Sequence, residues 1–141
     1  SRPWRLLLGA NPAERLKAEI KRLGGDKVIV EANRSDFRQL LSQCAISISQ
    51  VGYNTVVDLL ATGAPAIVIP FEGESAQSEQ SARAERLESM GRARVLSEEA
   101  LSARRLCDLV DKMTDVSHSW FPRITCNGAK NSAMALQKHL E

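Results

Sequence analysis

The sequence predicts an α/β fold, in which an open and mostly parallel sheet is flanked by helices. Short apolar runs alternate with longer stretches whose apolar residues recur at helical spacing, as in consecutive βα units. Two of the runs, Ala45–Ser49 and Ala66–Pro70, are rich in β-branched residues, which is typical of strands covered on both faces. A chain of 141 residues with 43% hydrophobic residues is long enough to bury one core. We therefore expect a single domain over residues 1–141.

Five strands and six helices are expected in alternating order. The first strand is Trp4–Leu8, and the first helix, Ala13–Leu23, ends at Gly24-Gly25, which supplies the left-handed cap that closes many helices. Residues 114–141 are expected to form a trailing loop and a C-terminal helix. The other expected strands are Lys27–Glu31, Ala45–Ser49, Ala66–Pro70 and Ala93–Leu96, and the other expected helices are 36–43, 53–62, 79–90, 102–113 and Ala129–Leu140.

Composition excludes several classes of function. Nineteen Lys and Arg against seventeen Asp and Glu give a net charge of +2, too small for a nucleic-acid-binding protein. The three cysteines are far apart, and no D-x-D motif or His and carboxylate cluster has the spacing of metal ligands, so no metal and no cofactor is expected. The longest apolar runs, such as Ala64–Phe71, are well short of the ~20 residues that span a membrane. A cytoplasmic setting fits these features best.

The turn after the third expected strand has the pattern of an anion site. Gly52 is expected to take a backbone conformation closed to other residues, and the chain then enters a helix directly. The N–H groups of Tyr53, Asn54 and Thr55 would point out of the helix end, where the helix dipole favours a phosphate. Asp58 lies one turn deeper and is suited to accept hydrogen bonds from ribose hydroxyls. The turn alone also fits plain helix capping, so the two interpretations stay open at this point.

A second polar segment follows the next strand. The loop Phe71–Ser78 leads into a helix that begins with Glu79 and Gln80. Because adjacent parallel strands end at the same edge of a sheet, this loop is expected to close over whatever the Gly52 turn holds. Glu79 and Gln80 offer donors and acceptors that suit sugar hydroxyls.

The ordered combination of these motifs resembles a known family. It is similar to the C-terminal domain of the bacterial N-acetylglucosaminyltransferases that complete the lipid-linked peptidoglycan precursor, which is of the glycosyltransferase family 28 type. The resemblance covers roughly residues 4–113. It is carried by Ser49–Asp58, Gly63-Ala64-Pro65, Ile69-Pro70-Phe71, Glu79-Gln80, and Arg83-Ala84 before Gly91.

The resemblance implies a Rossmann-like domain that holds a UDP-sugar donor in a two-domain transferase of the GT-B type. The reaction implied moves a sugar from a UDP-N-acetylhexosamine or UDP-hexose to an acceptor hydroxyl. Carried over by position, Gly52 and Thr55 lie at the diphosphate, Asp58 at the ribose, Glu79 and Gln80 at the donor sugar, and Asn33 and Arg34 near the uracil.

Several departures limit what the resemblance carries over. The family usually has Glu where this chain has Asp58, and Gln50-Val51 replaces small polar residues before the glycine. Family domains begin one βα unit earlier, and an N-terminal acceptor-binding domain usually supplies the catalytic base. We therefore expect no catalytic residue in this chain, no activity from the chain alone, and a longer protein compatible with peripheral association at the inner face of a membrane. A UDP-sugar epimerase or hydrolase on the same fold, and a non-catalytic interaction module, stay open as alternatives.

Overall fold

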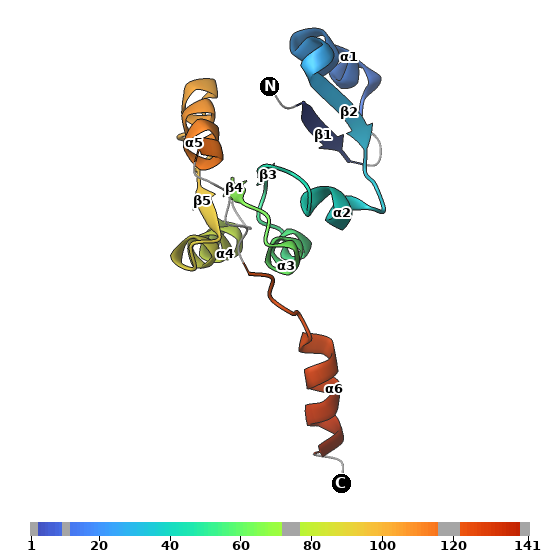
Figure 1. Ribbon diagram of the computed structural model, residues 1–141, viewed down its shortest axis with the longest axis vertical. Coiled ribbons are helices and arrows are strands. Elements are labelled where there is room, and N and C mark those ends of the chain that lie inside the picture. The colour runs from blue at the N-terminus through green and yellow to red at the C-terminus, as the bar shows by residue number, and fades with distance from the viewer. Residues whose placement is uncertain (1–2, 10–11, 72–76, 116–121, 139–141) are drawn as a thin grey trace. The chain divides into compact units, whose positions relative to one another are not determined.

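The computed structural model describes residues 3–9, 12–71, 77–115 and 122–138 (Figure 1). The chain divides into two compact units, Ser1–Phe37 and Arg38–Glu141, and each is described by itself.

The first unit is one βαβ element. Strand β1 (Trp4–Leu8) pairs in parallel with β2 (Val28–Ala32), and α1 (Glu14–Gly24) with the short 3-10 helix η1 (Gly25–Lys27) connects them. The structure explains why both residues at the end of α1 are glycines. Gly25 has a φ of 54°, which favours glycine, and a Cβ on Gly24 would lie 2.3 Å from a methyl carbon of Val28. The expected glycine end of this helix is thus confirmed, but with ψ −144° Gly25 does not have the left-handed helical conformation that was expected of the cap.

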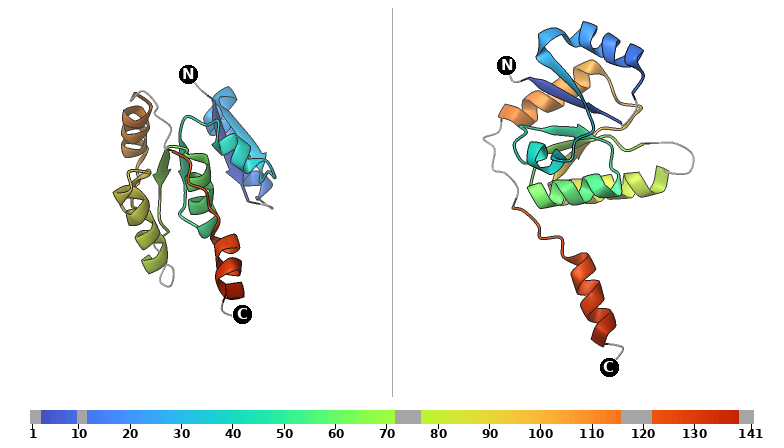
Figure 2. Two further views of the ribbon diagram at one scale, coloured as in Figure 1. Left: turned by 60° about the horizontal axis from the view of Figure 1, so that its bottom comes forward. Right: turned by 90° about the vertical axis from the view of Figure 1, so that its right-hand side faces the viewer.

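The second unit is built on three parallel strands in the order β3-β4-β5. Figure 2 shows it from two further directions, with α3 and α4 beside its strands. The strand pairing is parallel throughout, with Ser47 opposite Ala66 and Ala66 opposite Ala93. In chain order the elements are α2 (Phe37–Leu41), which begins at the boundary of the two units, β3 (Ser47–Ser49), α3 (Tyr53–Thr62), β4 (Ala66–Val68), α4 (Gln77–Ser89), β5 (Ala93–Val95), α5 (Ala103–Asp115) and α6 (Gly128–Lys138).

The core of the second unit lies around β4. All three residues of this strand are completely buried, as expected for a central strand covered on both faces. Leu59 of α3 is 3% exposed and Leu87 of α4 is 2% exposed, and burial of such a side chain contributes about 1.5–3 kcal/mol. The core therefore fixes α3 and α4, the two helices that carry most of the predicted site.

The α/β class, the parallel strands and the flanking helices are confirmed. The strand pairing differs from the single sheet expected, because within the described ranges β1 and β2 form one sheet and β3, β4 and β5 form another.

The tail contacts the second unit through backbone atoms. The N–H of Ile124 donates to the carbonyl of Leu60 in the last turn of α3 at 2.9 Å, and Arg92 donates to the carbonyl of Pro122 at 2.8 Å. Part of the expected trailing loop, residues 116–121, and the end of the C-terminal helix lie outside the described residues. Across the described ranges, every helix is too short or too polar to cross a membrane.

Candidate functional site

The predicted anion turn joins β3 to α3. The completely buried Val51 anchors it, and Gly52 is the N-cap residue of α3. The first backbone bond of the helix runs from the Val56 N–H to the Gly52 carbonyl at 3.1 Å, and within the described ranges no side chain caps the helix. The N–H groups of Tyr53, Asn54 and Thr55 therefore have no partner within the helix, as the first turn of any α-helix requires. This is the arrangement that suits an anion.

The reason expected for glycine at position 52 is wrong. Gly52 has φ −67° and ψ 160°, an extended conformation that any residue adopts. Among the described residues, a Cβ at this position would meet only the Thr55 hydroxyl oxygen within 4 Å, at 3.9 Å. Neither backbone strain nor packing thus requires a glycine here. What the missing side chain provides is open space beside the N–H groups of the helix end.

Gln80 ties the two predicted loops together. Its side-chain oxygen accepts the N–H of Val51 at 3.2 Å and the N–H of Phe71 at 3.0 Å. One side chain of α4 thus fixes the segment after β3 to the segment after β4. Part of the second loop, residues 72–76, lies outside the described residues. The oxygen of Gln80 is used by the protein, so its amide NH₂ is the end suited to a ligand.

Glu79 belongs to a cluster at the N-terminal end of α3. Its carboxylate accepts the Tyr53 hydroxyl at 2.8 Å and contacts the Arg83 guanidinium at 3.3 Å. The Arg83 guanidinium carbon lies 4.0 Å from the centre of the Tyr53 ring, and its Nε donates to the Val51 carbonyl at 3.0 Å. The Tyr53 hydrogen bond first, and Arg83 second, hold the pKa of Glu79 below its usual value. The cluster places a cation next to the predicted anion turn.

Asp58 forms an ion pair that the sequence did not predict. The Arg38 Nε donates to one Asp58 carboxylate oxygen at 2.5 Å, and the Asp58 side chain is 13% exposed. The Thr62 hydroxyl donates to the Asp58 backbone carbonyl and not to the carboxylate. Asp58 lies on α3 beyond Thr55, and the expected position of the two residues on one helix is confirmed.

Asn33 and Arg34 lie in the first unit, in the loop after β2. The Arg34 guanidinium is held by Asp36 through two contacts of 2.7 Å and by Glu31 at 2.9 Å. This pairing raises the pKa of Arg34 and lowers the pKa of Asp36, with the hydrogen bond between them as the main cause. The Asn33 side-chain oxygen accepts the Arg34 N–H at 3.0 Å. Their role near a uracil stays a prediction.

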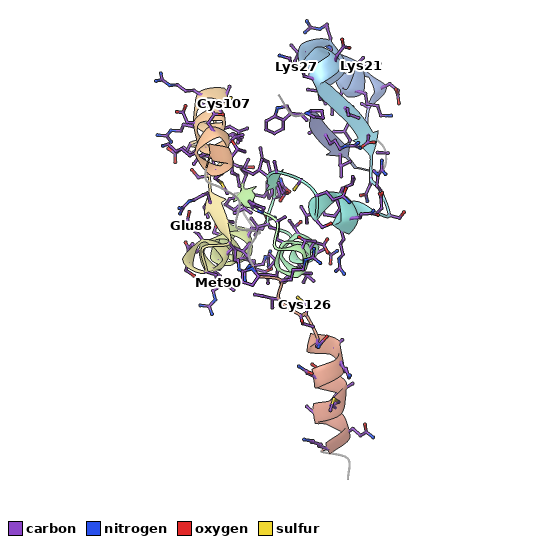
Figure 3. All side chains as sticks on the ribbon, viewed as in Figure 1. Lys21, Lys27, Glu88, Met90, Cys107 and Cys126 are labelled. Atoms are coloured by element: carbon purple, nitrogen blue, oxygen red, sulfur yellow. The ribbon has the colours of Figure 1, made fainter. Side chains whose placement is uncertain are left out.

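Two arginines of the site were not predicted. Arg83 stands in the motif that carried the resemblance but was given no role, and Arg38 lies in a short helix without a motif. Their partners, Glu79 and Asp58, stay site predictions. Among the described residues, no group of three His, Cys, Asp or Glu side chains is placed to hold a metal. The three cysteines are free, and Cys107 and Cys126 lie exposed on different parts of the chain (Figure 3).

Comparisons with known proteins give the family. Residues 4–140 match the model of the "Glycosyltransferase family 28 C-terminal domain". The chain is 30% identical to the "UDP-N-acetylglucosamine--N-acetylmuramyl-(pentapeptide) pyrophosphoryl-undecaprenol N-acetylglucosamine transferase" of Lachnoclostridium phytofermentans over 100 residues. These aligned residues make up 71% of this chain and 28% of the relative. The identically named protein of Anaplasma marginale is 26% identical over 98 residues, 70% of this chain and 27% of the relative. That of Thermotoga maritima is 37% identical over 67 residues, 48% of this chain and 20% of the relative.

The chain thus spans about a quarter of the length of the curated relatives that it matches. The family match extends over nearly all of the chain and includes both loops of the site. The chain belongs to glycosyltransferase family 28, as a C-terminal domain of that family.

Proposed function

We propose that this chain binds the nucleotide part of a UDP-sugar, as the donor-binding domain of a GT-B glycosyltransferase. The observation that carries the proposal is the N-terminal end of α3, where Gly52 leaves open space and no side chain caps the N–H groups. The names of the relatives add the chemistry of the donor, because each is called a UDP-N-acetylglucosamine transferase. The Arg83 guanidinium also lies beside the turn, where it donates to the Val51 carbonyl and contacts the Glu79 carboxylate at 3.3 Å.

In the proposed binding mode the diphosphate lies at Gly52, Asn54 and Thr55, and the ribose lies at Asp58. Glu79 and the NH₂ of Gln80 face the donor sugar, a UDP-N-acetylhexosamine or UDP-hexose. An acceptor hydroxyl attacks the anomeric carbon, and UDP leaves with the bonding electrons. The N–H groups of the helix end and the Arg83 guanidinium then stabilise the negative charge that grows on the diphosphate.

In this proposal the acceptor-binding site and the catalytic base lie in another part of the full-length protein. The chain contains no candidate base in its predicted site set, so the chain by itself is expected to be inactive. The whole protein is expected in the cytoplasm, in peripheral contact with the membrane that carries a lipid-linked acceptor.

Isothermal titration calorimetry tests the proposal. The full-length gene product that contains this chain is titrated with UDP and, as the control, with ADP, which has the same diphosphate and ribose but a different base. Binding of UDP at micromolar concentration with weaker binding of ADP supports a UDP-sugar site. Absence of UDP binding by a folded protein would refute it.

A turnover assay separates the enzymatic alternatives. Sugar transfer that requires an added acceptor fits a transferase, whereas product formation from the UDP-sugar alone would indicate an epimerase or a hydrolase. Binding of UDP without turnover under either condition would favour a non-catalytic nucleotide-sugar-binding module.

A further inference from the structure

The ion pair between Arg38 and Asp58 leaves polar groups of both residues without a protein partner. The hydrogen bond of the pair joins Nε of Arg38 to Oδ1 of Asp58, at 2.5 Å. In the part of the chain that the structure describes, the terminal guanidinium nitrogens of Arg38 and the second oxygen of Asp58 contact no other protein group. The Arg38 side chain is 63% exposed, so its free donors face the solvent, whereas the Asp58 side chain is 13% exposed.

Stability does not explain why a long side chain is held in this place. An ion pair with one strongly exposed partner contributes about 0–1 kcal/mol, and part of that offsets the lost side-chain freedom of arginine. The pair does fix the Asp58 carboxylate in one orientation. It also places a hydrogen-bond donor and a hydrogen-bond acceptor side by side at the surface of α3.

This arrangement has the chemistry to recognise two neighbouring hydroxyl groups. The free oxygen of Asp58 accepts a hydrogen bond from one hydroxyl, and a terminal nitrogen of Arg38 donates to the oxygen of the other. An anion is a poor ligand for the pair, because the Asp58 carboxylate cancels the charge of the guanidinium. Asp58 also lies three residues beyond Thr55, about 4.5 Å further along the helix axis, so the pair is displaced from the anion turn.

We propose that Arg38 and Asp58 together recognise the ribose, Arg38 at the 2′ hydroxyl and Asp58 at the 3′ hydroxyl, so that Arg38 determines specificity for a ribonucleotide. The inference rests on the proposed function and deepens it.

The test compares UDP with 2′-deoxy-UDP in calorimetric titrations of the full-length gene product. The unaltered protein is expected to prefer UDP about tenfold or more, as expected for one hydrogen bond to a charged group. Arg38→Gln is expected to weaken UDP binding about tenfold but to change 2′-deoxy-UDP binding by less than about twofold. The ratio of the two affinities should therefore fall towards one. Arg38→Lys keeps the charge but loses the planar guanidinium, and an intermediate ratio is expected.

The control is Arg104→Gln, which removes an exposed arginine of α5 and should leave both affinities unchanged. Thermal unfolding confirms that each variant is folded. If Arg38→Gln weakens both ligands equally, or weakens neither, the inference is overturned while the proposed function stands. If the unaltered protein binds neither ligand, the proposed function fails and the inference fails with it.

Discussion

Replacement of Gly52 by alanine tests whether the glycine is required for ligand binding or for the stability of the fold. The backbone at this position has φ −67°, and in the part of the chain that the structure describes an added Cβ meets one atom, at 3.9 Å. Fewer conformations in the unfolded chain would stabilise the variant by about 0.4–1 kcal/mol. Alanine is a poorer N-cap residue than glycine by a similar amount. The two effects oppose each other, so the free energy of unfolding should change by less than about 1 kcal/mol.

The binding of UDP should change far more. The new methyl group occupies the open space beside the N–H groups of the helix end, and a phosphate there would lose at least one charge-assisted hydrogen bond. Such a bond contributes about 1.5–3 kcal/mol, which corresponds to a dissociation constant about 10- to 150-fold higher. Calorimetric titration with UDP measures the affinity, and urea unfolding measures the stability.

Gly91→Ala provides the opposite control. Gly91 has φ 69°, so an alanine there is strained by about 1–2 kcal/mol although the space around it is open. It should lower stability and leave the affinity for UDP unchanged. An unaltered UDP affinity in Gly52→Ala would show that no phosphate lies at the turn. A stability loss above about 2 kcal/mol would show that the fold itself requires Gly52.

Three further changes test the contacts around the turn. Gln80→Ala should lower the free energy of unfolding in urea by about 1–3 kcal/mol, since two backbone N–H groups lose their acceptor, whereas the exposed control Glu85→Ala should change it by less than about 0.5 kcal/mol. A neutral Gln80→Ala would contradict the bridging role. Ser49→Ala should leave stability unchanged or raise it, because the buried Ser49 hydroxyl has no hydrogen-bond partner among the described residues; a loss above about 1 kcal/mol would reveal a partner. The pKa of Glu79 is lowered in the folded state, so its carboxylate contributes stability above its unfolded pKa, and this contribution is lost as the pH falls through the folded pKa. An NMR titration should place the Glu79 midpoint below its usual value, and Tyr53→Phe should raise it; an unmoved midpoint in that variant would remove the hydrogen bond as its main cause.

The helices with strong local signals were predicted most closely from the sequence. The helix expected at 53–62 is found at Tyr53–Thr62, because a turn glycine precedes it and Gly63, with φ 72°, follows as a left-handed cap. Such signals are absent at the ends of the strand expected at Ala45–Ser49, which is found only at Ser47–Ser49. A strand end depends on the neighbour with which it pairs, and one sequence does not show that neighbour.

The same limit applies to the candidate site. The positions of Gly52, Thr55 and Asp58 along one helix follow from local spacing, so the sequence was sufficient for them. The contact of Asp58 with Arg38 joins residues 20 positions apart, and its existence depends on how α2 lies against α3. Periodicity describes one helix at a time and contains no information on such a pair. Gly52 shows that a local pattern can also mislead. A glycine in a turn predicts a conformation closed to other residues, whereas the backbone at Gly52 is one that any residue adopts.

The contacts of α4 connect stability with binding in the proposed mode. Gln80 joins the loops that follow β3 and β4, and one residue earlier Glu79 reaches the end of α3 through Tyr53. Glu79 and Gln80 are adjacent residues of α4, so a shift of α4 that breaks the Gln80 hydrogen bonds also moves Glu79. Loss of Gln80 should therefore reduce both stability and sugar recognition, whereas loss of Glu79, which is exposed and outside the core, should reduce sugar recognition with a smaller loss of stability. The two losses have different signatures because one residue holds the loops and the other faces the ligand.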